Sequence, residues 1–250
     1  EVVKSTRVTG AAWAMFLKKR ESVGRSPFTV AQVRLLQTTV VEEGGQVVDR
    51  LFAGLTCCLV ARRLRYADAQ RSNEEPSLDV VESGYGFLEV PLTDTKTTNT
   101  PRAKRVRKVG VGHAVGFDGV EWAKSWLALR AKVGISASKF GCLMPAPDGK
   151  GGWLKRRLRS HELLGWLKVF LVAASVRPVG KQLLGTHSSK TTMLSWIGKA
   201  GLKKSDRRAL GYHAKPGDTQ VNLYSRDVQA APTRRMWKLE MAIQSGKFRP

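Results

Sequence analysis

Residues 186–227 read THSSKTTMLSWIGKAGLKKSDRRALGYHAKPGDTQVNLYSRD, and this stretch decides how the rest of the chain is understood. Small and apolar residues recur in it at the spacing of one helix face, at Thr191, Leu194 and Ile197. That spacing predicts a helix that begins near the start of the stretch. Gly201 stands where such a helix would end, because glycine readily adopts the left-handed backbone that closes a helix.

Four side chains in this stretch are suited to phosphate chemistry. His187 and Lys190 are three residues apart at the predicted helix start, so they project from one face and can reach the same anion. His213 and Tyr224 follow, on either side of a Pro-Gly break. Packing alone does not account for these four residue types in this order.

With residues from the first half of the chain, the order resembles that of the tyrosine recombinases, the phage-integrase-like site-specific DNA recombinases. That family carries an Arg, a Lys on a β-hairpin, a His-x-x-Arg motif, a His or Trp, and a nucleophilic Tyr. The matching residues here are Arg65, Lys96, His187 with Lys190, His213 and Tyr224. The segments ARRLRYADAQ and GYH…YSRD are most similar to the DIRS-like and crypton-like recombinases of eukaryotic retroelements.

The resemblance spans roughly residues 28–244 and departs from the family pattern in two places. Lys190 stands where the family usually has Arg, and His213 lies one residue beyond the usual Leu-Gly-His position. The resemblance implies a mainly α fold with a small antiparallel β-sheet, like a tyrosine-recombinase catalytic domain. Residues 28–250 would form that domain, and residues 1–27 would be a linker and remnant of an N-terminal DNA-clamping domain.

The same resemblance implies how the site residues act. Tyr224 would attack the phosphodiester and store the bond energy as a 3′-phosphotyrosyl link. Arg65, Lys190, His187 and His213 would stabilise the charge of the transition state, and Lys96 would be the general acid. The reaction needs no metal and no cofactor, and its substrate is double-stranded DNA, held by a homotetramer.

Some assignments have rivals in the sequence. Arg65 competes with Arg62 and Arg63, and is preferred because Asp68, three residues on, matches the family's Arg-x-x-acid pattern. Lys104 or Lys108 could replace Lys96, because a hairpin register cannot be read from one sequence. His113 and His161 have no partner at useful spacing and are expected to be structural or exposed.

Two other functions compete with recombination. A type IB topoisomerase uses similar chemistry, but those enzymes carry a Ser-Lys-x-x-Tyr pattern that is missing around Tyr224. A catalytically decayed, transposon-derived DNA-binding protein is the stronger rival, because Lys190 is a departure at a catalytic position.

Composition agrees with a nucleic-acid partner. The formal net charge is +23 and the sequence pI is about 10.5, which favours a polyanion. A basic run is expected to lie along the DNA backbone, through Arg102, Lys104, Arg105, Arg107 and Lys108. No apolar run is long enough to predict a membrane span. Cys57, Cys58 and Cys142 have no metal spacing, and an odd number with an adjacent pair predicts reduced thiols in an intracellular protein. The expected location is the nucleus if the organism is eukaryotic and otherwise the cytoplasm.

Periodicity predicts most of the remaining elements. Helices are expected after the cap residue Thr29, from Val47 to about Arg63, over 119–133, after a Ser160 cap, after a Ser205 cap, and from Pro232 to Gly246. Strands are expected at 87–92 and 106–111, paired as a hairpin, and residues 141–152 are expected to be a loop.

Overall fold

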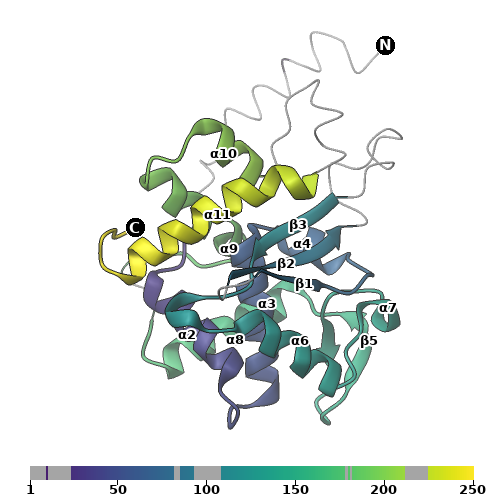
Figure 1. Ribbon diagram of the computed structural model, residues 1–250. Coiled ribbons are helices and arrows are strands. Elements are labelled where there is room, and N and C mark those ends of the chain that lie inside the picture. Colours follow the sequence, from purple (N-terminus) through teal and green to yellow (C-terminus); the bar gives the residue numbers. More distant parts are fainter. Residues whose placement is uncertain are drawn as a thin grey trace.

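The computed structural model describes residues 24–81, 85–92, 108–177, 182–211 and 225–250, together with the single residues Gly10 and Gly180. Within these ranges the chain is mainly helical, with one three-stranded and one two-stranded antiparallel sheet (Figure 1). The predicted fold class, mainly α with a small antiparallel sheet, is confirmed. Among the described residues, no helix combines the length and apolar content that crossing a bilayer requires.

Two helices at the start of the described chain lie where periodicity predicted them. The helix α2 (Val30–Val41) is capped by Thr29, whose hydroxyl accepts from the Gln32 amide at 3.2 Å, while the Gln32 side chain accepts from the Thr29 amide at 3.0 Å. This reciprocal pair satisfies two amides that a helix start leaves without partners.

The next helix, α3 (Val47–Arg62), is the centre of the molecule. It is buried all round from Leu51 onward, which is typical of a helix enclosed by other elements. Its neighbours are α2, α6 (Trp122–Lys132), α9 (Thr186–Lys199) and the last strand of the larger sheet.

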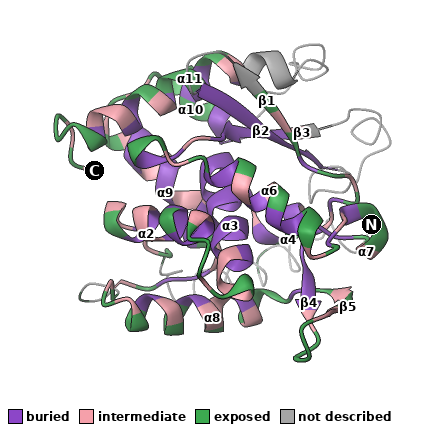
Figure 2. Ribbon diagram, turned by 60° about the horizontal axis from the view of Figure 1, so that its bottom comes forward, coloured by how far each residue is buried: buried purple, intermediate pink, exposed green. Residues whose placement is uncertain are grey.

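The larger sheet is covered by helices on both faces. Its strands are β1 (Ser77–Val81), β2 (Tyr85–Leu92) and β3 (Lys108–His113), with β2 in the middle and antiparallel to both neighbours. Phe87 faces α11 (Ser225–Gln244), whereas Leu88 belongs to the main core around α3. Every residue of β2 is therefore buried, as the continuous purple strand in Figure 2 shows. Burial on both faces explains why β2 lacks a clean alternation of polar and apolar residues.

Several elements differ from the sequence-based expectation. β1 was not predicted, and the predicted loop over 141–152 contains β4 (Pro145–Pro147), which pairs with β5 (Trp153–Arg157). β1 and β4 each pair with the next strand in the sequence, and both are short, so their local signal is weak. The short helices α4 (Tyr66–Gln70) and α7 (Ala137–Phe140) were also not predicted, and α10 (Lys204–Leu210) begins one residue before its expected Ser205 cap. The helix α8 (Ser160–Ala173) includes Ser160, so Arg159 occupies the cap position.

The C-terminal helix begins earlier than predicted. α11 starts at Ser225, so Pro232 lies inside it and not in its first turn. Contacts of Ala230 with the sheet and of Gln229 with Arg63 hold the turns before the proline, and tertiary packing outweighs the local signal. The predicted apolar face of α11 is buried in the core of this same chain, through Met236, Leu239 and Ile243.

Candidate active site

The end of α3 places three arginines in different surroundings. Arg62 and Arg63 are fully buried. The Arg62 guanidinium donates to the backbone carbonyl of Leu88. The Arg63 guanidinium donates to the backbone carbonyls of Leu210 and Val111. Arg63 has a left-handed backbone with φ of 53°, which ends the helix. The chain then extends, so that Arg65 is only half buried, precedes α4 and lines a surface cavity.

Hydrogen bonds to Leu158 and Met144 hold α4, the helix that follows Arg65, in place. Tyr66 donates to the Leu158 carbonyl at 2.5 Å, and Gln70 donates to the same carbonyl at 3.3 Å and accepts from the Met144 amide at 2.9 Å. Burial is the main reason that the pKa of Tyr66 is raised, so its hydroxyl stays protonated and can donate this bond. These bonds fix the orientation of α4, and with it the position of Arg65.

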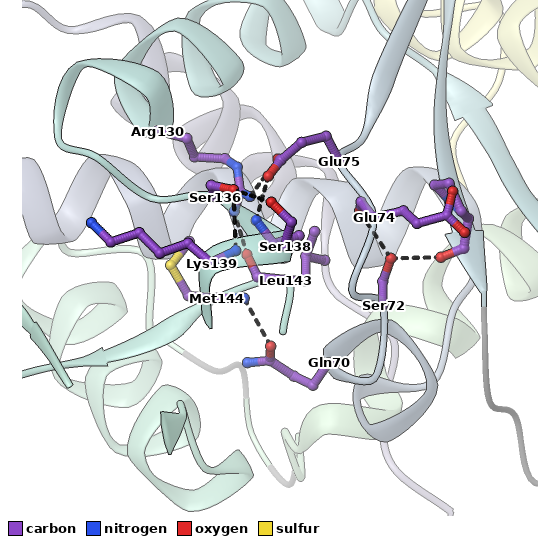
Figure 3. Close-up of polar contacts among 12 residues, drawn as sticks. Gln70, Ser72, Glu74, Glu75, Arg130, Ser136, Ser138, Lys139, Leu143 and Met144 are labelled. Atoms are coloured by element: carbon purple, nitrogen blue, oxygen red, sulfur yellow. Dashed lines mark hydrogen bonds and ion pairs between the residues drawn. The ribbon is translucent and has the colours of Figure 1, made fainter. Parts of the chain in front are cut away.

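A wider polar network supports the same region (Figure 3). Arg130 is buried, contacts Glu75 at 3.2 Å and also donates to the Leu143 carbonyl. The carboxylate of Glu75 also accepts from the Ala137 amide, while Ser72 donates to the Pro91 carbonyl at 2.6 Å. The chain from Gln70 to Glu75 is therefore held against α7 and β2, so α4 has little freedom to shift.

The second half of the candidate site comes from the start of α9. The Ser188 hydroxyl accepts from the Gly185 amide at 3.0 Å, and the Thr192 hydroxyl accepts from Phe28 at 2.9 Å, which fixes the first turns. His187 is exposed at this end. Lys190 is half buried, and its ammonium donates to the Gly211 carbonyl at 3.4 Å.

The charge of Lys190 is coupled to that of Arg65. The pKa of Lys190 is lowered, first by burial and then by repulsion from Arg65 and Arg63, while Asp68 acts in the opposite direction. The fold has thus gathered cations around Lys190, and only partly compensates them with a carboxylate. A bound anion would relieve this repulsion.

A cavity of about 580 Å³ joins the two halves of the site. Its wall includes Arg65 beside α4 and His187 at the start of α9, two residues far apart in the sequence. None of its described lining residues is acidic, and its basic lining residues are Arg65, Arg71, Arg157, Arg159, His161 and His187. The first turns of both α8 and α9 also line the cavity, and helix starts favour anions. The arrangement is suited to binding phosphate.

Sequence reasoning missed part of this cavity. Arg157 and Arg159 were assigned no role, although the basic run 155–159 was a signal that could have drawn attention to them. His161, expected to be structural or exposed, is exposed and lines the cavity. His113 is structural, because it is buried and lies 2.9 Å from the buried Glu240 carboxylate of α11.

The remaining predicted site residues fall outside the description of the structure. Lys96, His213 and Tyr224 lie outside the described residues, as do the basic residues Arg102, Lys104, Arg105 and Arg107. For Lys108 the structure gives only the backbone, at the start of β3. In the described part of the chain, no group of three His, Cys, Asp or Glu residues is placed to hold a metal ion. The three cysteines are free and buried.

Comparisons with known proteins give structural matches only. No protein-family model matches the chain, and no curated protein matches it. The chain is similar to a Flpe mutant in a DNA Holliday junction complex, with a TM-score of 0.49 and 12% identity over 95% of this chain and 56% of that one. It is also similar to Flpe in a second Holliday junction complex, with a TM-score of 0.44 and 13% identity over 87% of this chain and 53% of that one. The chain therefore spans about half the length of these solved structures.

Proposed function

We propose that the chain is a DNA strand-transferring enzyme of the tyrosine-recombinase type, of the DIRS-like or crypton-like kind that its motifs resemble. The observation that carries the proposal is the cavity in which Arg65 and His187 meet, with Lys190 close enough to Arg65 for their charges to interact. These three residues are members of one motif order in the sequence. The cavity has the cationic lining that a phosphodiester requires.

The proposed reaction conserves the energy of the DNA backbone. The Tyr224 oxygen, as a phenolate whose proton has passed to solvent, forms a bond to phosphorus while the bond from phosphorus to the 5′-oxygen breaks, and Lys96 supplies the proton that this oxygen takes up. The 3′-phosphotyrosyl link is later attacked by a 5′-hydroxyl, whose proton passes to the deprotonated Lys96; the phosphodiester is restored and Tyr224 leaves as the phenolate. Arg65, His187, Lys190 and His213 stabilise the negative charge that accumulates on the non-bridging oxygens at each step.

The test is covalent capture of a nicked suicide DNA duplex, which loses its 5′-hydroxyl fragment after cleavage and so traps the intermediate. The parent should form a protein–DNA adduct that survives denaturation, and Tyr224→Phe should lose the adduct while its DNA affinity stays within about twofold. Tyr212→Phe is the matched control and should still form the adduct. An adduct that persists in Tyr224→Phe would overturn the proposed nucleophile.

A decayed DNA-binding protein is the second candidate, and Lys190 is the observation that favours it. Arginine can hold two phosphate oxygens at once, whereas lysine offers a single compact charge. If the site is active, Lys190→Arg should raise the single-turnover rate of adduct formation, and Lys190→Ala should nearly abolish it. Salt-sensitive DNA binding without any adduct, in both the parent and Lys190→Arg, would favour the decayed protein.

A further inference from the structure

Part of the cavity wall comes from a segment that the proposed reaction does not use. Arg157, at the end of β5, and Arg159, Ser160 and His161, at the start of α8, all line the cavity and are all exposed. Leu158 lies between the two arginines and is buried, with 2% exposure. Because alternate residues of an extended segment point to opposite sides, the burial of Leu158 directs both arginines outward.

Hydrogen bonds fix this segment relative to Arg65. The Leu158 carbonyl accepts from Tyr66 at 2.5 Å and from Gln70 at 3.3 Å, both on the helix that directly follows Arg65. The Leu158 amide donates to the Met144 carbonyl at 3.0 Å. The backbone that carries the two outward-facing arginines is thus held at a set position from Arg65 before any ligand binds, which reduces the entropic cost of binding.

The local acidic group is already engaged by another arginine. Glu162 accepts two hydrogen bonds from Arg156, at 2.7 and 2.9 Å, and one from the Arg159 amide at 2.6 Å. The pair with Arg156 is the main reason that the pKa of Glu162 is lowered to about 2. Arg157 contacts the Gly141 carbonyl at 3.4 Å, a long bond to a neutral group. The charge of Arg159 also contributes to the lowering of the Glu162 pKa, but in the described residues neither the Arg157 nor the Arg159 guanidinium forms an ion pair.

We infer that Arg157, Arg159 and His161 form a second phosphate subsite, which binds the phosphodiester next to the one held by Arg65, His187 and Lys190. The cavity volume of about 580 Å³ lies within the roughly 300–1,000 Å³ that is typical of ligand pockets, and two phosphate groups fit within such a volume. This inference rests on the proposed function, because the ligand of the subsite is a nucleic-acid strand. Its contacts read no bases, so it positions the strand without selecting a sequence.

The experiment compares small probes that carry one or two phosphates, so it does not depend on cleavage. The probes are thymidine 5′-monophosphate and a thymidine dinucleotide with a 5′-phosphate, and binding is measured by calorimetry at low salt. The parent should bind the two-phosphate probe about tenfold more tightly, because a second phosphate gains charge-assisted hydrogen bonds. Arg157→Ala/Arg159→Ala should lose this difference while binding the one-phosphate probe as the parent does.

The control is Lys150→Ala/Lys155→Ala, which removes the same charge from the same hairpin but at exposed residues that do not line the cavity. This control should keep the tenfold preference, and thermal unfolding should show that both double variants fold. The inference fails if the parent has no preference for the two-phosphate probe, or if Arg157→Ala/Arg159→Ala retains it. Preference for two phosphates without any covalent adduct would overturn the proposed cleavage and leave the subsite standing.

Discussion

Arg63 and Arg65 show how one residue type serves two purposes within a few positions. The Arg63 guanidinium is fully buried and donates to carbonyls of β3 and of α10. It also contacts Met236 and Gln229 of α11. Arg65 is half buried and lines the cavity. The first arginine therefore joins elements of the fold, whereas the second is available to a ligand.

We expect Arg63→Ala to lower the free energy of unfolding by about 3 kcal/mol or more, because it leaves buried carbonyls without donors and opens a cavity. Arg65→Ala should change this free energy by less than about 1 kcal/mol while weakening DNA binding. Urea denaturation of both variants, with a filter-binding assay, measures the contrast. Equal destabilisation by the two substitutions would contradict the division of roles.

Lys190 is expected to lower stability at neutral pH in the absence of DNA. Its pKa is below 10.5 in the folded chain, so the folded state binds the proton less tightly than the unfolded state does. The free energy of unfolding is therefore lowered by its full amount at pH values below the folded-state pKa. The loss disappears as the pH rises through 10.5. The long bond to Gly211 offsets little of it.

Lys190→Met should therefore raise the melting temperature at pH 7, because it removes the partly buried charge. The difference from the parent should narrow as the pH is raised toward 10.5. Lys155→Met, at an exposed position, is the control and should leave the melting temperature unchanged. A lower melting temperature for Lys190→Met at pH 7 would show that the charge is not strained.

At the scale of the elements, the distance between α3 and α6 depends on a glycine of α3. The Trp126 ring lies against Gly54, where an added Cβ would stand 2.0 Å from a ring carbon. The indole N–H donates to the Leu51 carbonyl at 3.0 Å, which holds the ring in place. The two helices are therefore so close that only glycine, which has no side chain, fits at position 54.

Gly54→Ala should lower the free energy of unfolding by about 1–3 kcal/mol, because the ring must move or the helices must separate. Gly165→Ala is the matched control, since Gly165 is in the helix α8 with no atom within 4 Å of an added Cβ. That change should be neutral or stabilise by about 0.5–1 kcal/mol. Chemical denaturation of both variants decides the matter, and a neutral Gly54→Ala would show that Trp126 has room to shift.

For the whole molecule, the dominant property is charge. The excess of 23 positive charges is much greater than a single cavity can use. The cationic lining of the cavity is one part of a larger attraction toward a polyanion, which acts over a distance set by the salt concentration.

DNA affinity should therefore fall steeply with salt. About 6–10 phosphate contacts give a slope of log affinity against log salt of roughly −5 to −9 for double-stranded DNA. Titration of a labelled duplex between 50 and 200 mM salt measures this slope. A change in affinity of less than a few-fold over that range would contradict a DNA-binding role.

The sequence alone was enough for elements whose signals are local. The caps and periodicity of α2, α3 and α9 predicted their positions to within about two residues, because helix hydrogen bonds join near neighbours in the chain. The strands β2 and β3 were also recognised, and their antiparallel pairing is confirmed. The order of Arg65, His187 and Lys190 was visible in the sequence as well.

Only the tertiary structure brought distant segments together. The start of α11 depends on its contacts with Arg63 and the sheet, which lie far away in the sequence. The place of Arg157 and Arg159 in the cavity is set by the hydrogen bonds that Leu158 accepts from Tyr66 and Gln70, residues far away in the sequence. A charge pattern shows that cations are present, but the side of the molecule on which they gather depends on how the chain packs.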